Sequence, residues 1–402
     1  MVNVAVLGYG TIGSGVVEVL QTNTEVIAQR AGEEIAVKYI LDLRDFPGDP
    51  NADKIVHDYD IIDKDEDVQV VVECMGGVEP AYTFVKRALL NGRSVATSNK
   101  ELVAKHGAEL IAIAHEKNIN FLFEASVGGG IPIIRPLVQC LTADVIEEVS
   151  GILNGTTNYM LTRMKEEGIS FEEALKEAQE KGYAELHPEA DVEGYDACRK
   201  IAILTSLVAG KTVDFHKIHT EGITGIDPTD FAYAKKLDAT IKLLAVSRET
   251  ENGYQISVAP YLLKKENALA GVNDVFNAVA VCGNTLGDTM FYGRGAGKLP
   301  TASAVVADVV ECARHLQKTV GCLWEEGEAK VADFDSQEGR FFVRVSKKAR
   351  TDVEKVFGDV VPVVLDSALE EFAFVTESMQ EAEFEKCREQ IFGFVKKIRI
   401  KD

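Results

Sequence analysis

Cysteine is scarce in this sequence, and its spacing fits no metal site. There are seven cysteines in 402 residues, with no Cys-x-x-Cys pair and no cluster with histidine. The number is odd and the positions are scattered, so we expect reduced thiols and a cytoplasmic protein rather than a disulfide framework.

The sequence also lacks long apolar runs and an apparent leader. No stretch approaches the roughly 20 consecutive apolar residues that a membrane-spanning helix needs. The first residues, MVNVAVLGYG, show no charged start followed by a cleavable apolar segment, so we expect no signal peptide.

Positive charge is in short supply. Lysine and arginine number 43 against 64 acidic residues, a net charge of -21. This balance repels phosphate backbones and anionic bilayers, so we expect neither nucleic acid nor a membrane as a partner. A chain of 402 residues is long enough for two or three domains, each with its own core.

The first third of the sequence alternates strands and helices, which predicts an α/β domain with a Rossmann-type, doubly wound parallel sheet over residues 1–130. The helix expected at 301–316 completes this domain, within about 299–325. The expected strands are 2–7, 34–43, 68–74, 94–97 and 120–124, and the helices are 82–90 and 101–117.

The rest of the chain predicts two further domains. Residues 131–298 indicate a mixed α/β substrate and dimerisation domain, and 326–339 a polar linker. Residues 340–402 alternate as a ferredoxin-like βαββαβ unit. The expected strands are 145–153, 218–223, 254–262, 278–281, 289–292, 341–345, 360–365, 372–376 and 395–400; the helices are 171–181, 196–209, 231–242, 352–357 and 382–392.

A glycine turn, Gly8-Tyr9-Gly10-Thr11-Ile12-Gly13, joins the first strand to a helix. Such a turn lets backbone N–H groups and a helix N-terminus approach a pyrophosphate, so it predicts a dinucleotide site. On the second strand, Asp42 is suited to the ribose hydroxyls of NAD and Arg44 to the 2′-phosphate of NADP. The two share a face, and the choice stays open.

Three further polar segments follow expected strands. Lys100 lies at the carboxyl end of a strand, where ligands gather in open α/β sheets. Residues 124–132 combine a carboxylate with three glycines, which suits a hard cation or a domain hinge equally well. The turn at 154–158 fits either helix capping or a binding site.

The segment AELHPEADVEGYDACRKIAIL, residues 184–204, places many carboxylates before an apolar helix. Asp196 and Lys200 are four residues apart and therefore share one helical face. Nearby carboxylates favour the charged form of Lys200, which suits a proton donor to an alkoxide. A solvated ion pair at a helix start is the alternative.

Taken in order, these motifs resemble the homoserine dehydrogenase family over residues 1–325. The resemblance is carried by VLGYGTIGSGV, VVVECMGGVEPA, TSNKELVAKHG, FEASVGGGIPII, LNGTTNYML, GYAEL, DVEGYDACRKIAIL and FYGRGAGKLPTASAVVADV. It implies oxidation of L-homoserine to L-aspartate 4-semialdehyde, or the reverse, with NAD or NADP. We expect no kinase-like N-terminal extension, so the resemblance implies the monofunctional form.

The resemblance also assigns roles to residues. Lys200 corresponds to the proton donor and Lys100 to a second lysine near substrate and nicotinamide. The implied substrate residues are Glu185, Asp196, Tyr183, Thr156 and Asp191. The implied cofactor residues are Gly8, Gly10, Thr11, Ile12, Gly13, Arg44, Thr97, Ser98, Lys100, Gly182 and Gly297. The implied sodium ligands are Glu124 with the backbone oxygens of Val127, Gly129 and Ile131.

Two segments depart from the family pattern. His187 stands where the family usually has an acid, and we expect it to lie at the surface. The tail resembles an ACT regulatory domain in element order but lacks the usual Asp-x-Pro-Gly turn. Packing within a homodimer or homotetramer, or control by an amino acid such as threonine, is expected of it.

Two other functions are weighed against this one. A semialdehyde dehydrogenase would need an activated cysteine beside a histidine, and no histidine stands beside Cys74 or Cys198 in the sequence. A nicotinamide-binding sensor with the tail as its output would not need the lysines and acids of a proton-transfer site.

Overall fold

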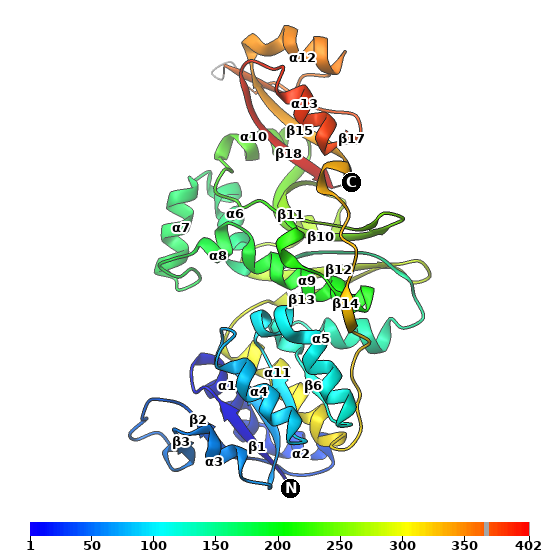
Figure 1. Ribbon diagram of the computed structural model, residues 1–402. Coiled ribbons are helices and arrows are strands. Elements are labelled where there is room, and N and C mark those ends of the chain that lie inside the picture. The colour runs from blue at the N-terminus through cyan, green and yellow to red at the C-terminus, as the bar shows by residue number, and fades with distance from the viewer. Residues whose placement is uncertain (366–369, 402) are drawn as a thin grey trace.

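The computed structural model describes residues 1–365 and 370–401. Three tiers are stacked along the long axis of the molecule, with the N-terminal domain at one end and the C-terminal unit at the other (Figure 1). After α11 (Lys298–Arg314), the chain runs along the side of the middle tier to reach the C-terminal unit.

The N-terminal tier is a six-stranded parallel sheet in the order β3-β2-β1-β4-β5-β6. Its strands are β1 (Val2–Leu7), β2 (Ile35–Leu41), β3 (Ile55–Val56), β4 (Val68–Glu73), β5 (Ser94–Thr97) and β6 (Phe121–Leu122). Its helices are α1 (Thr11–Thr22), α2 (Thr24–Ala31), α3 (Tyr59–Asp63), α4 (Ala81–Leu90), α5 (Lys100–Glu116) and α11.

Both faces of this sheet are buried, as a doubly wound sheet requires. Ala5 and Leu7 of β1 pack in the hydrophobic cluster that contains α4 and α5. Val4 and Val6 point the other way, into the cluster that contains α1 and α11. The predicted fold class is confirmed, and α11 returns late in the sequence to close the second face.

The glycine turn brings α1 very close to β1. A Cβ on Gly13 would lie 1.8 Å from the carbonyl oxygen of Gly8, and Gly8 itself has a φ of +91°. Glycine is therefore required at both positions. Gly10, at the start of α1, has nothing within 4 Å of a Cβ, so its backbone is open to a ligand.

The middle tier contributes most of its strands to one half of a long mixed sheet. Its strands are β7 (Ile146–Ile152), β8 (Lys211–Thr212), β9 (His219–Thr220), β10 (Ala239–Thr250), β11 (Gly253–Lys264), β12 (Phe276–Gly283) and β13 (Gly287–Arg294). Its helices are α6 (Gly155–Glu167), α7 (Phe171–Glu180), α8 (Glu189–Val192), α9 (Tyr195–Ala209) and α10 (Pro228–Lys236).

Two predictions in this tier were wrong. The helix expected at 231–242 ends at Lys236, because Asp238 adopts a φ of +52° and the chain turns into β10. β10 then pairs with β11 along its whole length. The strand expected at 218–223 shrinks to β9, two residues that pair with β11.

The C-terminal tier contains β15 (Glu338–Ser346), α12 (Arg350–Phe357), β16 (Glu371–Val375), β17 (Met379–Gln380), α13 (Glu381–Arg388) and β18 (Phe394–Lys401). The strand predicted at 360–365 is replaced by a single bridge between Val363 and Ala373. Pro362 lacks the N–H that a strand would use there. The predicted linker 326–339 includes most of β14 (Glu325–Glu328), which pairs with β8.

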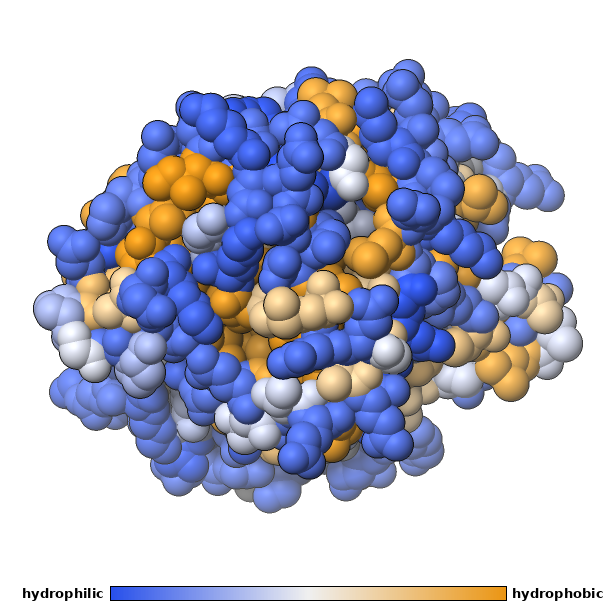
Figure 2. Space-filling model, turned by 90° about the horizontal axis from the view of Figure 1, so that it is seen from below, coloured by the Kyte–Doolittle hydropathy of each residue, from blue (hydrophilic) through white to orange (hydrophobic). Residues whose placement is uncertain are grey.

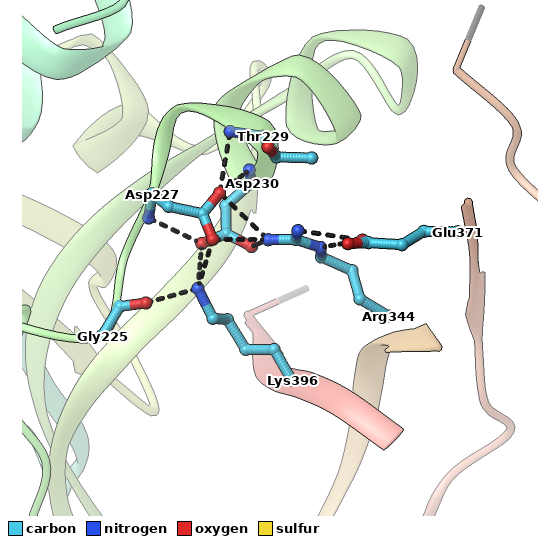
Figure 3. A network of polar contacts seen from close by, with 7 residues as sticks. All are labelled: Gly225, Asp227, Thr229, Asp230, Arg344, Glu371 and Lys396. Atoms are coloured by element: carbon cyan, nitrogen blue, oxygen red, sulfur yellow. Dashed lines mark hydrogen bonds and ion pairs between the residues drawn. The ribbon is translucent and has the colours of Figure 1, made fainter. Parts of the chain in front are cut away.

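The C-terminal tier shares a β-sheet with the middle tier. β18 pairs in parallel with β11, so the sheet runs continuously as β13-β12-β7-β10-β11-β18-β15-β16. Buried ion pairs reinforce the junction (Figure 3). There Arg344 of β15 and Lys396 of β18 converge on Asp227 and Asp230 at the start of α10.

The surface agrees with the charge balance. Seen from the end of the molecule formed by the N-terminal tier, hydrophilic residues cover most of the face, and apolar residues gather in several separate patches (Figure 2). Within residues 1–365 and 370–401, no helix has the length and apolar character needed to cross a bilayer.

Candidate active site

A two-part cleft follows the carboxyl ends of the parallel strands. One cavity of about 520 Å³ includes Gly8, Gly10, Asp42 and Arg44 in its lining. A second, of about 440 Å³, lies between the first and second tiers. The segment Cys74–Gly76 lines both, so the two cavities are adjacent, and together they are called the groove. The lining of the second includes Ile12, Gly76, Ser98, Lys100, Val127, Gly129, Lys200 and Gly297.

Asp42 and Arg44 are paired at the outer end of this groove. The Arg44 Nε donates to Asp42 Oδ1 at 2.9 Å, and the Tyr9 N–H donates to Asp42 Oδ2 at 2.8 Å. The hydrogen bonds from Arg44 hold the pKa of the Asp42 carboxyl well below its usual range. Asp42, which suits NAD, and Arg44, which suits NADP, thus form an ion pair with each other at the same end of the groove.

At the wall of the second, inner cavity, a buried carboxylate is held between two lysines, and both lysines line the cavity. Asp196, in α9, is 3% exposed. The Lys200 Nζ donates to Asp196 Oδ2 at 2.7 Å and to the Leu153 carbonyl at 2.8 Å. Lys100, at the start of α5, donates to Asp196 Oδ1. Burial opposes ionisation of Asp196, but the two lysine charges outweigh it and hold its pKa below the usual range.

Asn154 connects this carboxylate to α6. Its Oδ1 accepts the Thr157 N–H at 2.9 Å and so caps the helix. Its Nδ2 donates to Asp196 at 2.9 Å and to Asp191 at 2.7 Å. The predicted capping is confirmed, and the same side chain also contacts the two aspartates. Burial, and then the charge of Asp196, raises the pKa of Asp191.

A second buried acid, Glu73 at the end of β4, shapes the wall of the groove. It accepts the backbone N–H groups of Met75 at 2.7 Å and Gly76 at 3.3 Å. Thr97 donates its hydroxyl to Glu73 at 2.6 Å and is fully buried, so its side chain points away from the cleft. Ser98 lines the cleft instead. Sequence reasoning missed Glu73, which reads as one more residue of a buried strand.

Comparisons with known proteins agree with this geometry. Two family models match: "Homoserine dehydrogenase, NAD binding domain" over residues 8–124 and "Homoserine dehydrogenase" over residues 132–310. A homoserine dehydrogenase of Bacillus subtilis is 37% identical over 409 residues, which covers 95% of this chain and 93% of the relative.

The chain belongs to the homoserine dehydrogenase family.

Solved structures of homoserine dehydrogenases extend the likeness to the whole chain. One from Thiobacillus denitrificans is 34% identical, covers 100% of this chain and 98% of its own, and has a TM-score of 0.92. A hyperthermophilic archaeal homoserine dehydrogenase in complex with NADPH is 28% identical, covers 77% of this chain and 97% of its own, and has a TM-score of 0.65. The expected oxidoreductase with a nicotinamide dinucleotide site is confirmed.

This membership disfavours the two alternative functions. The sensor is not needed to explain the motifs, since homoserine dehydrogenase matches both of the first two tiers. A cysteine enzyme is also unsupported, because burial raises the pKa of the Cys74 thiol, which lines the groove.

The loop after α7 carries three predicted site residues that line neither cavity, Gly182 for the cofactor and Tyr183 and Glu185 for the substrate. The other predicted substrate residues, Thr156, Asp191 and Asp196, line neither cavity either. Tyr183 is 44% exposed, and its carbonyl accepts the Thr156 hydroxyl at 2.7 Å. Gly182 and Glu185 are also exposed, and among the described residues that line the two cavities none belongs to 182–185. His187 lies at the surface as expected, with its side chain 84% exposed.

Glu124, expected to bind sodium, is already hydrogen-bonded at both oxygens. Its Oε1 accepts the N–H groups of Ile133 and Ile134 at 2.6 and 2.8 Å, and its Oε2 accepts that of Arg135 at 2.7 Å. Gly129 has a φ of +57° in the adjoining turn. Within the part of the chain that the structure describes, no group of three or more His, Cys, Asp or Glu side chains suits a metal ion.

Proposed function

We propose that the protein interconverts L-homoserine and L-aspartate 4-semialdehyde, with Lys200 as the proton-transfer residue. The observation that carries this proposal is the Lys100–Asp196–Lys200 array in the inner cavity of the groove. A carboxylate and two lysines from different tiers meet where the dinucleotide groove opens onto the substrate domain.

The groove is suited to a nicotinamide dinucleotide. The open backbone at Gly10 and the N-terminus of α1 would hold the pyrophosphate. Asp42 or Arg44 would contact the adenosine ribose. A bound nicotinamide supplies the hydride acceptor for the alcohol or the donor for the aldehyde.

The hydrogen bonds of Lys200 support its role. An ammonium has three N–H donors, and Lys200 uses two, on Asp196 and on the Leu153 carbonyl. It lines the cavity, so a third donor is available to the substrate oxygen. In the reductive direction Lys200 gives a proton to the carbonyl oxygen as hydride reaches the carbon. In the oxidative direction Lys200 begins as the neutral amine and takes up the hydroxyl proton as hydride leaves the carbon, which returns it to the ammonium form.

The substrate ammonium is assigned to Asp191 and Glu185, with Asp196 as their neighbour. Asp191 uses one oxygen to accept from Asn154, and its other oxygen accepts no hydrogen bond from the described residues. Both oxygens of Asp196 are engaged by lysines. Glu185 reaches this place only if the exposed loop that carries it moves toward the cleft, together with Tyr183 and Gly182.

The backbone oxygens of Val127, Gly129 and Ile131 beside Glu124 are proposed as the sodium site. Because both Glu124 oxygens already accept amides, we assign the carbonyls the larger share of the coordination. The check is to compare activity and thermal unfolding in sodium with those in a large organic cation. Equal behaviour in both would remove the site.

An absorbance assay, performed once with NAD and once with NADP, tests the reaction. Purified protein is mixed with L-homoserine and either NAD or NADP near pH 9, and the absorbance of the reduced nicotinamide is followed. We expect reduction with at least one cofactor, and the ratio of the two rates gives the preference. Cofactor binding without turnover of homoserine would overturn the proposal and favour a sensor.

We also propose that the protein is a homodimer or homotetramer and that the ACT-like tail binds an amino acid such as threonine. The resemblance of the tail and its continuity with the substrate sheet support a regulatory connection. Sedimentation with and without threonine, alongside inhibition by threonine of the full chain, tests both. An unchanged rate at millimolar threonine would remove the effector.

A further inference from the structure

Lys242, in the middle of β10, is a buried lysine outside the cleft. It is 1% exposed. Its Nζ donates to Asn158 Oδ1 and Asn273 Oδ1, each at 3.0 Å, and to the Val272 carbonyl. All of these partners, drawn from the described residues, are neutral oxygens. A buried cation without a carboxylate lowers the stability of the fold, so its position calls for an explanation in terms of what it holds.

Asn158 is the centre of the group that Lys242 joins. Its Nδ2 donates to three backbone carbonyls of the segment 272–276, which leads into the first residue of β12: those of Val272, Asp274 and Phe276, at 3.2, 3.0 and 2.9 Å. Its Oδ1 accepts from Lys242. The side chain therefore ties the second turn of α6 to the segment 272–276, and Lys242 ties both to β10.

A second contact from the same segment reaches the first residue of α6. A Cβ on Gly155 would lie 2.8 Å from the Val275 carbonyl oxygen, so this helix end is packed directly on segment 272–276. Thr162, one turn further along α6, accepts the Asp274 N–H at 2.9 Å. Contacts at three positions of α6, Gly155, Asn158 and Thr162, thus fix where the helix lies along segment 272–276.

The first turn of α6 is also the support of the active site. Asn158 lies one turn after Asn154, and its N–H donates to the Asn154 carbonyl at 3.3 Å. Asn154 is the residue whose Nδ2 donates to Asp191 and Asp196. A shift of α6 would move those donors away from the two carboxylates.

We propose that Lys242 is a positioning residue for the homoserine reaction, which fixes α6 through Asn158 so that Asn154 holds Asp191 and Asp196 in place. The inference rests on the roles proposed above for these two acids. Lys242 touches neither substrate nor cofactor, and it acts by holding the helix on which the substrate site is built.

The experiment is steady-state kinetics of Lys242→Met in the full chain, with L-homoserine and with the preferred cofactor varied separately. We expect the KM for homoserine to rise at least fivefold and kcat to fall, while the KM for the nicotinamide changes less than twofold. A loss of folded enzyme lowers the measured kcat alone, so the rise in the homoserine KM is the deciding result.

Thr240→Val is the matched control. Thr240 is two residues away on the same strand and is buried, and its hydroxyl has no hydrogen-bond partner in the described structure. We expect wild-type kinetics from it. Lys242→Gln, which keeps two N–H donors, is expected to fall between Lys242→Met and the wild type.

The outcomes separate this inference from the proposed function. If the wild type does not turn over homoserine, the proposed function fails. If the wild type is active and Lys242→Met behaves as Thr240→Val does, the inference is overturned. Should Lys242→Met not fold, Asn158→Asp, which keeps the acceptor for Lys242 but loses donors to segment 272–276, is measured in the same way, and an unchanged homoserine KM overturns the inference.

Discussion

Two regions of this molecule use a similar arrangement, a buried aspartate bonded to two cations. In the cleft, Asp196 accepts from Lys100 and Lys200. At the C-terminal junction, Asp230 accepts from Arg344 and Lys396 (Figure 3). In both regions the acid comes from the first turn of a helix. Lys100, Arg344 and Lys396 reach it from another tier, whereas Lys200 lies one turn further along the helix of Asp196.

The difference lies in what the cations face. Lys200 lines an open cavity and retains a donor for a ligand. Arg344 is 3% exposed, and its guanidinium bonds to Glu371 as well as to Asp227 and Asp230. Its five donors face acids on two sides. On the role proposed for Lys200, the same chemistry serves proton transfer where one side is open, and attachment where every side is closed.

Lys200→Ala should give the largest effect and bears on the open site. We expect kcat to fall by about 10²- to 10⁴-fold, the usual range for loss of a general acid or base, with a modest change in the KM for homoserine. Asp196 keeps its bonds to Lys100 and Asn154, so the unfolding midpoint should change little. A change in KM alone would show that the assigned role is wrong.

Asp230→Asn should show the opposite pattern at the closed site. Breaking a buried ion pair on one side commonly lowers the free energy of unfolding by about 3–5 kcal/mol. The kcat of the folded enzyme should not change, because this site is part of the C-terminal junction and not of the cleft. Urea denaturation with parallel kinetics checks both. Asp227→Asn, whose side chain is 41% exposed, is the milder companion. A fall in kcat with stability preserved would break the contrast.

Sequence reasoning found the open site more readily than the closed one. Asp196 and Lys200 are four residues apart, so a helical pattern predicts their contact. Lys100 lies 96 residues from Asp196, and only its place at a strand end pointed to the cleft. Arg344 and Asp230 are 114 residues apart, and no local spacing connects them.

The fold shows the same limit. The parallel sheet follows from apolar runs and turns, each of which is local. β10 was missed because the apolar run after Phe231 fits a helix until Asp238 turns the chain, and a backbone with positive φ at aspartate leaves little trace in composition. Its pairing with β11, and that of β11 with β18, depends on contacts between distant segments. Glu185 cannot be placed in the cleft from sequence, because no local spacing relates its exposed loop to the residues that line the cleft.

Lys242 extends the comparison to a buried cation with no acid. Burial lowers its pKa from 10.5 to about 7. Between these values the unfolded chain binds more protons than the folded one, so the contribution of Lys242 to stability rises with pH. Below about pH 7 both states are protonated and the contribution is constant. The nearest charges are Lys165 and Glu166 of α6.

The measurement is the difference in unfolding free energy between the wild type and Lys242→Met from pH 6 to pH 9. Using the difference cancels the titration of the cysteines, which is shared by both proteins. We expect the stability of the wild type relative to Lys242→Met to rise by about 1–2 kcal/mol between pH 7 and pH 9. One titrating group can contribute at most about 1.4 kcal/mol per pH unit, which sets the upper limit. A flat difference would mean that the buried lysine stays charged throughout.

Arg44→Ala should give the smallest change in stability. The pair that it breaks, Arg44 with Asp42, is the exposed counterpart of the two buried arrangements. The Arg44 side chain is 63% exposed, and its pair with Asp42 faces the outer cavity. An exposed pair contributes at most about 1 kcal/mol, so the unfolding midpoint should hardly move. If Arg44 leaves Asp42 to bind a 2′-phosphate, its loss should weaken NADP by about tenfold and leave NAD nearly unchanged, as measured by the KM for each cofactor. If the loss of Arg44 weakened the binding of NAD and NADP equally, Arg44 would have a structural role, as Arg344 does, and would not bind the 2′-phosphate.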